Sequence, residues 1–322
     1  MEDEGGFHPL RLRPHASLNR TLLAALPAAE PRWVGQPASH LLRREALLQL
    51  ASELGAASAA DAFGRRLGHL IATLHSGRGD EMLHSDWRRA YRAYWTSIEQ
   101  VWLGGGLAAY PGRGLLAAAR AEAARLGASR PSIELAAWPS ALPLVGAART
   151  NAGIARRAVV LDFGHTAVKR GVATYRGRAL ARLQLLESLE PPAPAGLVDA
   201  FSDVVAATLR CAGADVDPNV VISVASDVDR GGRIVADGVS LYSPLGALEP
   251  AAVERALGLR TGIQPLRLRV VHDGTAAARG VVPTVPAAAV ITLGTSLGVG
   301  FAPPPDHLRP LAADFGVVDP AG

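Results

Sequence analysis

An apolar run at 158–161 leads into a segment that could bind phosphate, in which Asp162 is followed by Gly164, His165 and Thr166. Glycine lets the backbone approach an anion closely, and successive N–H groups together with a threonine hydroxyl can bind phosphate oxygens. The aspartate could hold Mg²⁺, usually through water. An ordinary β-hairpin with an Asp–Gly turn would contain the same residues, so both interpretations stay open at this point.

A second glycine–threonine turn lies further along the chain, again between two apolar runs. The run 291–293 leads to Gly294, Thr295 and Ser296, and the run 298–302 follows. Binding the β- and γ-phosphates of a nucleotide requires groups on both sides of the phosphate chain. Two such turns in one chain therefore indicate a phosphate clamp more strongly than either turn alone.

Three consecutive glycines, Gly104, Gly105 and Gly106, follow the apolar run 101–103. A backbone without side chains allows the flat surface of a ligand to come close to the chain. The alternative interpretation is a flexible turn between a strand and a helix, which glycine also serves.

His272 and Asp273 stand where the apolar run 268–271 meets small residues that begin a helix near Thr275. An aspartate at the end of a strand lies at the mouth of a cleft, where it can accept a proton from a substrate hydroxyl. The alternative is a helix N-cap, a role that aspartate often fills. Lys169, the only lysine of the chain, is either a solvated charge or a phosphate-facing one.

Cysteine usage and carboxylate spacing argue against two kinds of metal site. Cys211 is the only cysteine, which excludes a disulfide within the chain and a cysteine-rich zinc site. Asp227, Asp229 and Asp237 suggest a calcium loop, but Gly238 stands where that loop needs its bidentate glutamate. We therefore expect no zinc, and we interpret these aspartates as part of a solvated turn.

Length and composition predict a globular protein with two domains, since 49% of the 322 residues are hydrophobic and 19% are charged. The net charge is +4, yet the arginines are scattered, so we expect no nucleic-acid partner. The uncharged stretch 281–305 is broken by prolines and glycines, so we expect no membrane span. The acidic start of the chain is unlike a signal peptide, and we expect a soluble cytoplasmic protein.

Strands and helices alternate along the sequence, which predicts an α/β fold with at least two sheets. Helical periodicity covers 41–74, and a hairpin is expected where Arg176 and Gly177 separate two apolar runs. The other expected elements are helices at 114–126, 141–149, 196–211 and 250–257, and strands at 133–137, 220–225, 268–271 and 288–293.

Together these segments resemble the ROK (repressor, open reading frame, kinase) family of sugar kinases, which belongs to the actin, hexokinase and heat-shock-chaperone superfamily. Segment 161–171 is similar to the first phosphate loop of the family, and segment 291–300 is similar to the second. Segment 271–280 resembles the stretch that carries the catalytic aspartate. Segment 103–107 resembles the adenosine-binding Leu-Gly-Gly-Gly, and 221–235 resembles a further strand-and-glycine segment.

The resemblance implies two ribonuclease-H-like domains with a nucleotide cleft between them, in circularly permuted order. In the family the adenosine segment comes last, whereas here it precedes both phosphate turns. One domain would be 151–284, with the first phosphate turn and the catalytic aspartate. The other would combine 285–322 with 1–150 and carry the second phosphate turn and the adenosine segment. Permutation is tolerated where chain ends are close and exposed.

The resemblance also implies ATP-dependent phosphorylation of a sugar hydroxyl, with a hexose or an amino sugar as the acceptor. Asp273 would be the catalytic base, and Asp162 would hold Mg²⁺ through water. ATP would bind at the two phosphate turns and the three glycines named above. His272 and Asp314 would contact the sugar. A homodimer is a further expectation.

Some positions depart from the pattern of the family. His165 and Ser296 replace glycines of the phosphate loops, His272 replaces an asparagine, Asp314 replaces a glutamate and Val317 replaces a histidine. The zinc cysteines of the family are absent. The altered sugar contacts motivate two alternatives, a sugar or nucleotide sensor without phosphoryl transfer and a transcriptional regulator of the same family.

Overall fold

The computed structural model describes residues 41–76, 86–193, 196–229, 231–235 and 240–320. Two compact units, each with its own core, make up this part of the chain. Unit 1 holds the described residues of Met1–Ser140 together with Pro283–Ala302, and unit 2 holds those of Ala141–Val282 together with Pro303–Gly322. The division differs from the expected domain limits, because 141–150 and 303–322 lie in unit 2. Each unit combines a sheet with helices, which confirms an α/β fold with two sheets.

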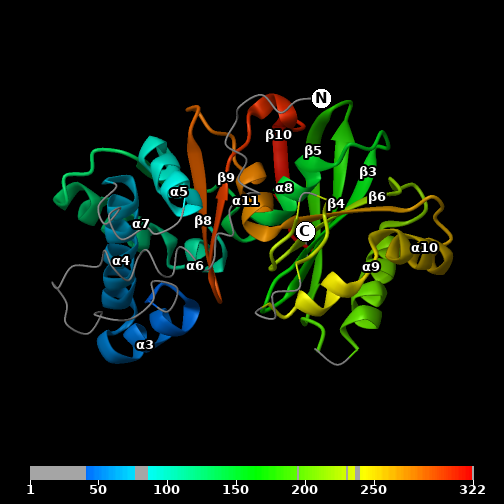
Figure 1. Ribbon diagram of the computed structural model, residues 1–322, viewed down its shortest axis with the longest axis horizontal. Coiled ribbons are helices and arrows are strands. Elements are labelled where there is room, and N and C mark those ends of the chain that lie inside the picture. The colour runs from blue at the N-terminus through cyan, green and yellow to red at the C-terminus, as the bar shows by residue number, and fades with distance from the viewer. Residues whose placement is uncertain (1–40, 77–85, 194–195, 230, 236–239, 321–322) are drawn as a thin grey trace. The chain divides into compact units, whose positions relative to one another are not determined.

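The sheet of unit 1 has the strand order β2-β1-β8-β9, and Figure 1 labels β8 and β9. The strands are β1 (Gln100–Gly104), β2 (Ser132–Leu135), β8 (Ala288–Leu293) and β9 (Leu297–Phe301). β1 pairs in parallel with both β2 and β8, and β8 and β9 form an antiparallel hairpin. β1 and β8 are buried along almost their whole length, as expected for apolar runs in the middle of a covered sheet.

The described helices of unit 1 are α3 (Arg44–Leu54), α4 (Ala56–Ser76), α5 (Asp86–Ser97), α6 (Gly106–Ala109) and α7 (Gly112–Arg125). The helical pattern over 41–74 is interrupted at Gly55, whose φ of +80° favours glycine and separates α3 from α4. Helices α4 and α7 pack backbone to backbone, since a Cβ atom at Gly68 would lie 2.2 Å from the carbonyl oxygen of Ala119. This contact and the core residues Phe63 and Trp95 anchor the helices.

The sheet of unit 2 has the strand order β10-β5-β4-β3-β6-β7 (Figure 1). The strands are β3 (Arg157–Phe163), β4 (Val168–Arg176), β5 (Ala179–Leu189), β6 (Asn219–Val224), β7 (Arg267–His272) and β10 (Leu311–Val318). β3, β4 and β5 form an antiparallel meander, whereas β6 and β7 extend the sheet from β3 in parallel and β10 lies parallel to β5. The ends of β3, β6 and β7 therefore meet at one edge of the sheet, as parallel strands require.

Helices cover both faces of this sheet. Val159, Leu161 and Phe163 of β3 pack in the core with α9 (Leu197–Ala212), so the alternation along the strand directs Asp162 to the opposite face. On that face lie α8 (Leu142–Thr150) and α11 (Asp273–Gly280), which pack together (Figure 1). A Cβ atom at Gly146 of α8 would lie 1.7 Å from the carbonyl oxygen of Ala276 of α11, so the two helices touch through their backbones.

The remaining described elements of unit 2 are α10 (Pro250–Thr261) and the short helices η5 (Ser243–Ala247) and η6 (Pro305–His307). The short helix η4 (Pro139–Ala141) precedes α8, where the chain passes from unit 1 to unit 2. Within the described ranges, we find no helix that is both long enough and apolar enough to cross a membrane.

Candidate functional site

Asp162 is the second-to-last residue of β3, so it lies inside the strand rather than in the turn that follows it. In the register of the sheet its neighbours are Lys169 on β4 and Ser223 on β6. The hydroxyl of Ser223 donates a hydrogen bond of 2.8 Å to Asp162 Oδ1, and Lys169 Nζ lies 3.5 Å from Oδ2. Two neighbouring strands thus supply one polar partner for each carboxylate oxygen.

Asp162 is buried near the end of the strand, and only 4% of the residue is exposed. Burial raises the pKa of this carboxyl, and the negative charge of Asp273 acts in the same direction, whereas Lys169 and Ser223 oppose the rise. Burial is the largest cause, because a desolvated carboxylate loses its hydration without full compensation. Asp273 therefore lies close enough for its charge to contribute to the raised pKa of Asp162, although burial is the main cause.

The turn after Asp162 is closed by hydrogen bonds of its own backbone and by a buried tyrosine. The Gly164 amide donates to the Ala167 carbonyl at 3.1 Å, and the hydroxyl of Tyr242 donates to the Gly164 carbonyl at 2.8 Å. The Tyr242 ring stands edge-on to Phe163 at a centroid distance of 5.8 Å. His165 is partly exposed and Thr166 exposed, so the side chains expected to meet a ligand lie at the surface of the turn.

Asp273 is the first residue of α11, and His272 is its N-cap. The Thr275 amide donates to Nδ1 of His272 at 3.4 Å, and Nε2 of His272 lies 3.1 Å from Asp273 Oδ1. The same carboxylate oxygen accepts from the Gly274 amide at 2.6 Å. The alternative interpretation of Asp273 as a helix N-cap is thus wrong, because the preceding residue, His272, caps the helix.

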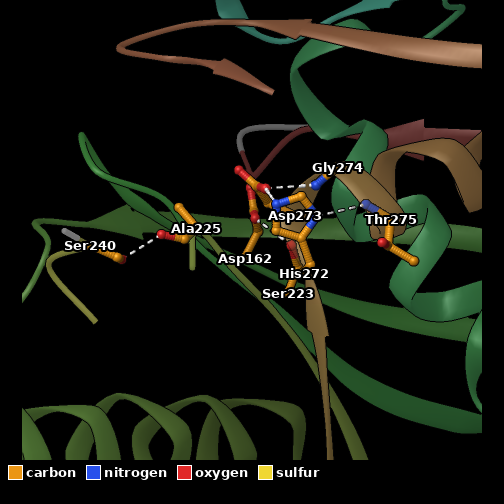
Figure 2. A network of polar contacts seen from close by, with 8 residues as sticks. All are labelled: Asp162, Ser223, Ala225, Ser240, His272, Asp273, Gly274 and Thr275. Carbon is orange, nitrogen blue, oxygen red and sulfur yellow. Dashed lines mark hydrogen bonds and ion pairs between the residues drawn. The ribbon is translucent and has the colours of Figure 1, made fainter. Parts of the chain in front are cut away.

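Figure 2 shows the side chains of Asp162, Ser223, His272 and Asp273 gathered at the ends of their strands. They come from β3, β6, β7 and the start of α11, which the parallel register of the sheet brings to one edge. His272 is buried, whereas a quarter of the Asp273 side chain is exposed. No described residue donates a hydrogen bond to Asp273 Oδ2, so this oxygen is available to an incoming donor.

The three glycines and the second glycine–threonine turn are brought together in unit 1. Gly104 pairs with Thr292 across β1 and β8, two positions before Gly294. Gly105 has a φ of +86°, and a Cβ atom there would lie 2.3 Å from the carbonyl oxygen of Leu293. Glycine is therefore required at position 105, both by its backbone conformation and by its contact with the strand that leads into the turn.

Around this pair of segments, the Arg44 amide donates to the Gly294 carbonyl at 2.8 Å, and the Gly105 amide donates to the Pro139 carbonyl at 2.8 Å. Gly106 begins α6, and Thr295 and Ser296 form the turn between β8 and β9. The candidate phosphate and adenosine segments of unit 1 thus form one structural group, and Asp162, the first turn, His272 and Asp273 form another in unit 2.

Asp314, expected as a sugar contact, is not brought to Asp162 and Asp273. It lies on the edge strand β10, three strands from β3, which corresponds to about 14 Å across the sheet. The register also places it near the start of β3, whereas Asp162 is near the end. Its exposed carboxylate forms an ion pair with Arg176. The structure thus separates Asp314 from Asp162 within unit 2.

Three residues of the site were not predicted in their observed roles. Ser223 and Tyr242 were not singled out, since their contacts arise only when β6 pairs with β3 and Tyr242 comes next to the turn after β3. Lys169 was expected to be either a solvated or a phosphate-facing charge, and the hairpin register instead pairs it with Asp162. Across the described ranges, no three His, Cys, Asp or Glu side chains are grouped so that they could hold a metal ion.

Comparisons with known proteins give one partial structural match. No family model matches the chain, and no curated protein sequence matches it. A solved structure of an inorganic polyphosphate/ATP-glucomannokinase from Arthrobacter sp. strain KM is similar, with a TM-score of 0.34 and 22% sequence identity. The match covers 48% of this chain and 61% of the glucomannokinase, which is less than two thirds of its length. The site is therefore interpreted from its own residues.

Proposed function

We propose that this protein transfers a phosphoryl group from ATP to a hydroxyl of a hexose or an amino sugar. The observation that carries the proposal is that the register of β3, β6 and β7 brings Asp273, which directly follows β7, to the same edge of the sheet as Asp162 (Figure 2). A carboxylate beside a backbone turn that can bind phosphate is the arrangement that phosphoryl transfer to a hydroxyl needs. The resemblance of both segments to phosphate and catalytic segments of the ROK family supports the same assignment.

Asp273 is the proposed acceptor of the proton from the sugar hydroxyl. Its Oδ1 is engaged by His272 and by the Gly274 amide, which fixes the plane of the carboxylate. Its Oδ2 is proposed to meet the substrate hydroxyl, and a quarter of the side chain is exposed. A carboxylate held in one orientation at hydrogen-bond distance from a hydroxyl can remove its proton as the oxygen attacks.

Asp162 is the proposed residue for Mg²⁺, which it would hold through water. Magnesium in phosphoryl-transfer sites is bound by one or two carboxylates together with water and phosphate oxygens, and Asp162 would supply one such carboxylate. When bound, the ion neutralises negative charge on the phosphates. Lys169 adds a positive charge beside Asp162, because its Nζ lies 3.5 Å from Oδ2 of that residue. Backbone amides of the turn and the hydroxyl of Thr166 would bind phosphate oxygens.

The segments of unit 1 are proposed to take part in nucleotide binding through Gly294, Thr295 and Ser296 and through the three glycines. This step rests on the sequence resemblance and on the contact between Gly105 and Leu293 that joins the two segments. The ribonuclease-H-like character of the domains, their circularly permuted order and a nucleotide cleft belong to the same proposal.

A second candidate function is a nucleotide or sugar sensor that does not transfer phosphate. Two observations favour it. His272, where the ROK family has an asparagine that contacts sugar, is buried and directed to Asp273 instead. Asp314 lies on the far edge strand. A sensor would bind nucleotide or sugar with these contacts altered but release no ADP.

The test is an assay of ADP release by the full chain with ATP, Mg²⁺ and a panel of hexoses and amino sugars. Asp273→Asn keeps the size of the side chain but removes the base, and we expect sugar-dependent ADP release to fall by about a thousandfold. Asp203→Asn, on the exposed side of α9, is the matched control and should retain activity. Wild-type rates for Asp273→Asn would refute the assignment of the base. Nucleotide binding without ADP release for any sugar would favour the sensor.

A further inference from the structure

Two arginines from different elements of unit 2 meet at the C-terminal residue of α8. Nη1 of Arg269, on β7, lies 3.4 Å from the carbonyl oxygen of Thr150, and Nη1 of Arg279, on α11, lies 3.5 Å from Thr150 Oγ1. Arg279 is in the last turn of α11, at the opposite end of that helix from Asp273. The two guanidinium groups thus lie around one residue, outside the proposed phosphoryl-transfer site.

This group carries positive charge without a carboxylate to balance it. Within the described ranges, no Asp or Glu oxygen lies within 4.0 Å of Arg149, Arg269 or Arg279. Arg149 is buried beside them and donates to the carbonyls of Arg279 at 2.7 Å and of Val281 at 2.5 Å. Burial lowers the pKa of Arg279 to about 10, and the charge of Arg269 acts in the same direction.

Most hydrogen-bond donors of the two guanidinium groups are left for another partner. Each guanidinium has five N–H groups, and within the described part of the chain Arg269 and Arg279 each direct one of them to Thr150, at the long end of the hydrogen-bond range. Capping the C-terminus of α8 explains part of the positive charge, since a helix end carries about half a negative charge. Two full charges at one helix end exceed that amount.

We propose that Arg269 and Arg279, positioned beside Thr150, bind the phosphoryl group of a small molecule at a second site. A phosphoryl dianion matches two neighbouring positive charges, and its oxygens accept the forked N–H groups that arginine presents. Thr150 orients the pair but does not donate to the ligand, because its hydroxyl already donates to the Gly146 carbonyl at 2.7 Å. The site does not depend on the activity proposed above.

The experiment measures binding of inorganic phosphate to the full chain by calorimetry and by the rise in unfolding temperature, against chloride at equal ionic strength. We expect Arg269→Gln and Arg279→Gln each to weaken phosphate binding about tenfold or more, as loss of a charge-assisted contact implies. Arg210→Gln, an exposed position on α9, is the matched control and should bind like the wild type. Phosphate binding by the double variant at wild-type strength would overturn the proposal.

Two further arms separate this site from a structural role and from the proposed kinase site. In buffer without phosphate, both glutamine variants should unfold at or above the wild-type temperature, because each relieves repulsion between like charges. A drop of several degrees, with no effect of phosphate on the wild type, would identify helix caps and overturn the proposal. Asp273→Asn should retain phosphate binding at Arg269 and Arg279 even if sugar phosphorylation is absent. Acetate should bind more weakly than phosphate, and equal binding would overturn the phosphoryl assignment.

Discussion

At the scale of single residues, the carboxylate of Asp162 is held in a position that opposes its ionisation. Burial and Asp273 raise its pKa, and the partners on the adjacent strands, Lys169 and Ser223, only partly offset this. Sites that bind charged ligands often retain such strain, because the ligand or its cation supplies the missing compensation. Whether the ionised carboxylate of Asp162 raises or lowers the free energy of unfolding can be measured from the pH dependence of stability.

Asp162→Asn should raise the unfolding temperature at pH 7–8, and the gain should shrink as the pH falls toward the ordinary carboxyl range near 3.8. The folded-state pKa is raised, so the stabilising contribution of the protonated carboxyl is complete below the unfolded pKa and lost as the pH rises through the folded one. At neutral pH the ionised group therefore lowers the free energy of unfolding. Calorimetric unfolding of both proteins between pH 4 and pH 8 measures the difference.

The exposed Asp203→Asn variant is the control for this pH series and should show no comparable trend. An unfolding temperature for Asp162→Asn below that of the wild type at neutral pH would contradict the expected sign.

His272 caps the N-terminus of α11 and also contacts Asp273, and two substitutions can separate these roles. Because the Thr275 amide donates to Nδ1, the ring hydrogen is on Nε2 and is directed to Asp273. Asparagine is a good N-cap, so His272→Asn should retain stability but lose the donation to Asp273. If the kinase assignment holds, its kcat should fall roughly tenfold to a hundredfold, as for other supporting hydrogen bonds, with little change in KM.

His272→Ala should lose about 1 kcal/mol of stability in addition, since alanine cannot cap the helix. Unfolding curves and steady-state kinetics of the two variants measure the two roles independently. Equal kcat for wild type and His272→Asn would show that the histidine does not position Asp273.

At the scale of elements, the position of Asp273 depends on how closely α11 packs on α8. The two helices meet at glycines: a Cβ atom at Gly146 would lie 1.7 Å from the Ala276 carbonyl oxygen, and one at Gly280 would lie 2.6 Å from the Leu142 carbonyl oxygen. Both obstacles are backbone atoms, which cannot move aside as a flexible side chain can. The interface therefore fixes α11, and with it the start of the helix.

Gly146→Ala should lower the free energy of unfolding by about 3 kcal/mol or more, because overpacking at this contact must shift a helix. Gly316→Ala, in β10 of the same unit, is the matched control, since nothing lies within 4 Å of its added Cβ atom. Chemical unfolding of the two variants measures the contrast. Equal stability of the two variants would show that α8 and α11 can separate without cost.

Local sequence patterns were sufficient to predict the elements that neighbour each other in the chain. The hairpin of β4 and β5 was expected at Arg176 and Gly177, and it forms there with Gly177 at a φ of +57°. The helices predicted at 141–149 and 196–211 are α8 and α9 within one residue at each end. These elements depend on apolar periodicity and on turn residues, which the sequence displays directly.

Contacts between distant segments could not be predicted in the same way. The segment 313–317 was interpreted as a sugar contact from its resemblance to the ROK family, and nothing within it indicates that β10 pairs with β5. The hydrogen bond from Tyr242 to Gly164 likewise joins segments that are far apart in the sequence. Within unit 2, the acidic pair was expected from its motifs, whereas the residues that tune its charge were found only in the folded sheet.

At the scale of the whole molecule, the chain passes between the two units three times, after Ser140, after Val282 and after Ala302. In unit 2 the buried Arg149 contacts the segment that precedes the second passage and the segment that follows the third. It donates to the carbonyls of Arg279 and Val281, just before the chain leaves, and to the carbonyl of Arg309, just after it returns. α8 is thus integral to unit 2, although it directly follows unit 1 in sequence.

A cut between α8 and β3 should therefore leave the protein intact. Ile154 is fully exposed in this connection, whereas the Asn151 side chain and the Ala155 amide on either side are bound to unit 2. With a protease site inserted after Ile154, we expect the two fragments to elute together after cleavage and to unfold within a few degrees of the uncut chain. Insertion of the same site at Gly177, in the tight β4–β5 turn, is the comparison. Separation of the fragments on a sizing column would contradict the integral position of α8 and weaken the permutation proposal.

The strand order has a consequence for synthesis on the ribosome. β1 and β2 emerge early, but β8, which lies beside β1 in the finished sheet, follows only after β3 to β7 have been made. Until then β1 lacks its neighbour on that side, which is the kind of exposed strand edge that chaperones protect in nascent chains. The stretch Ala288–Val318 supplies β8, β9 and β10 and thereby completes both sheets. Translation that stalls before it would leave two unfinished sheets on one nascent chain.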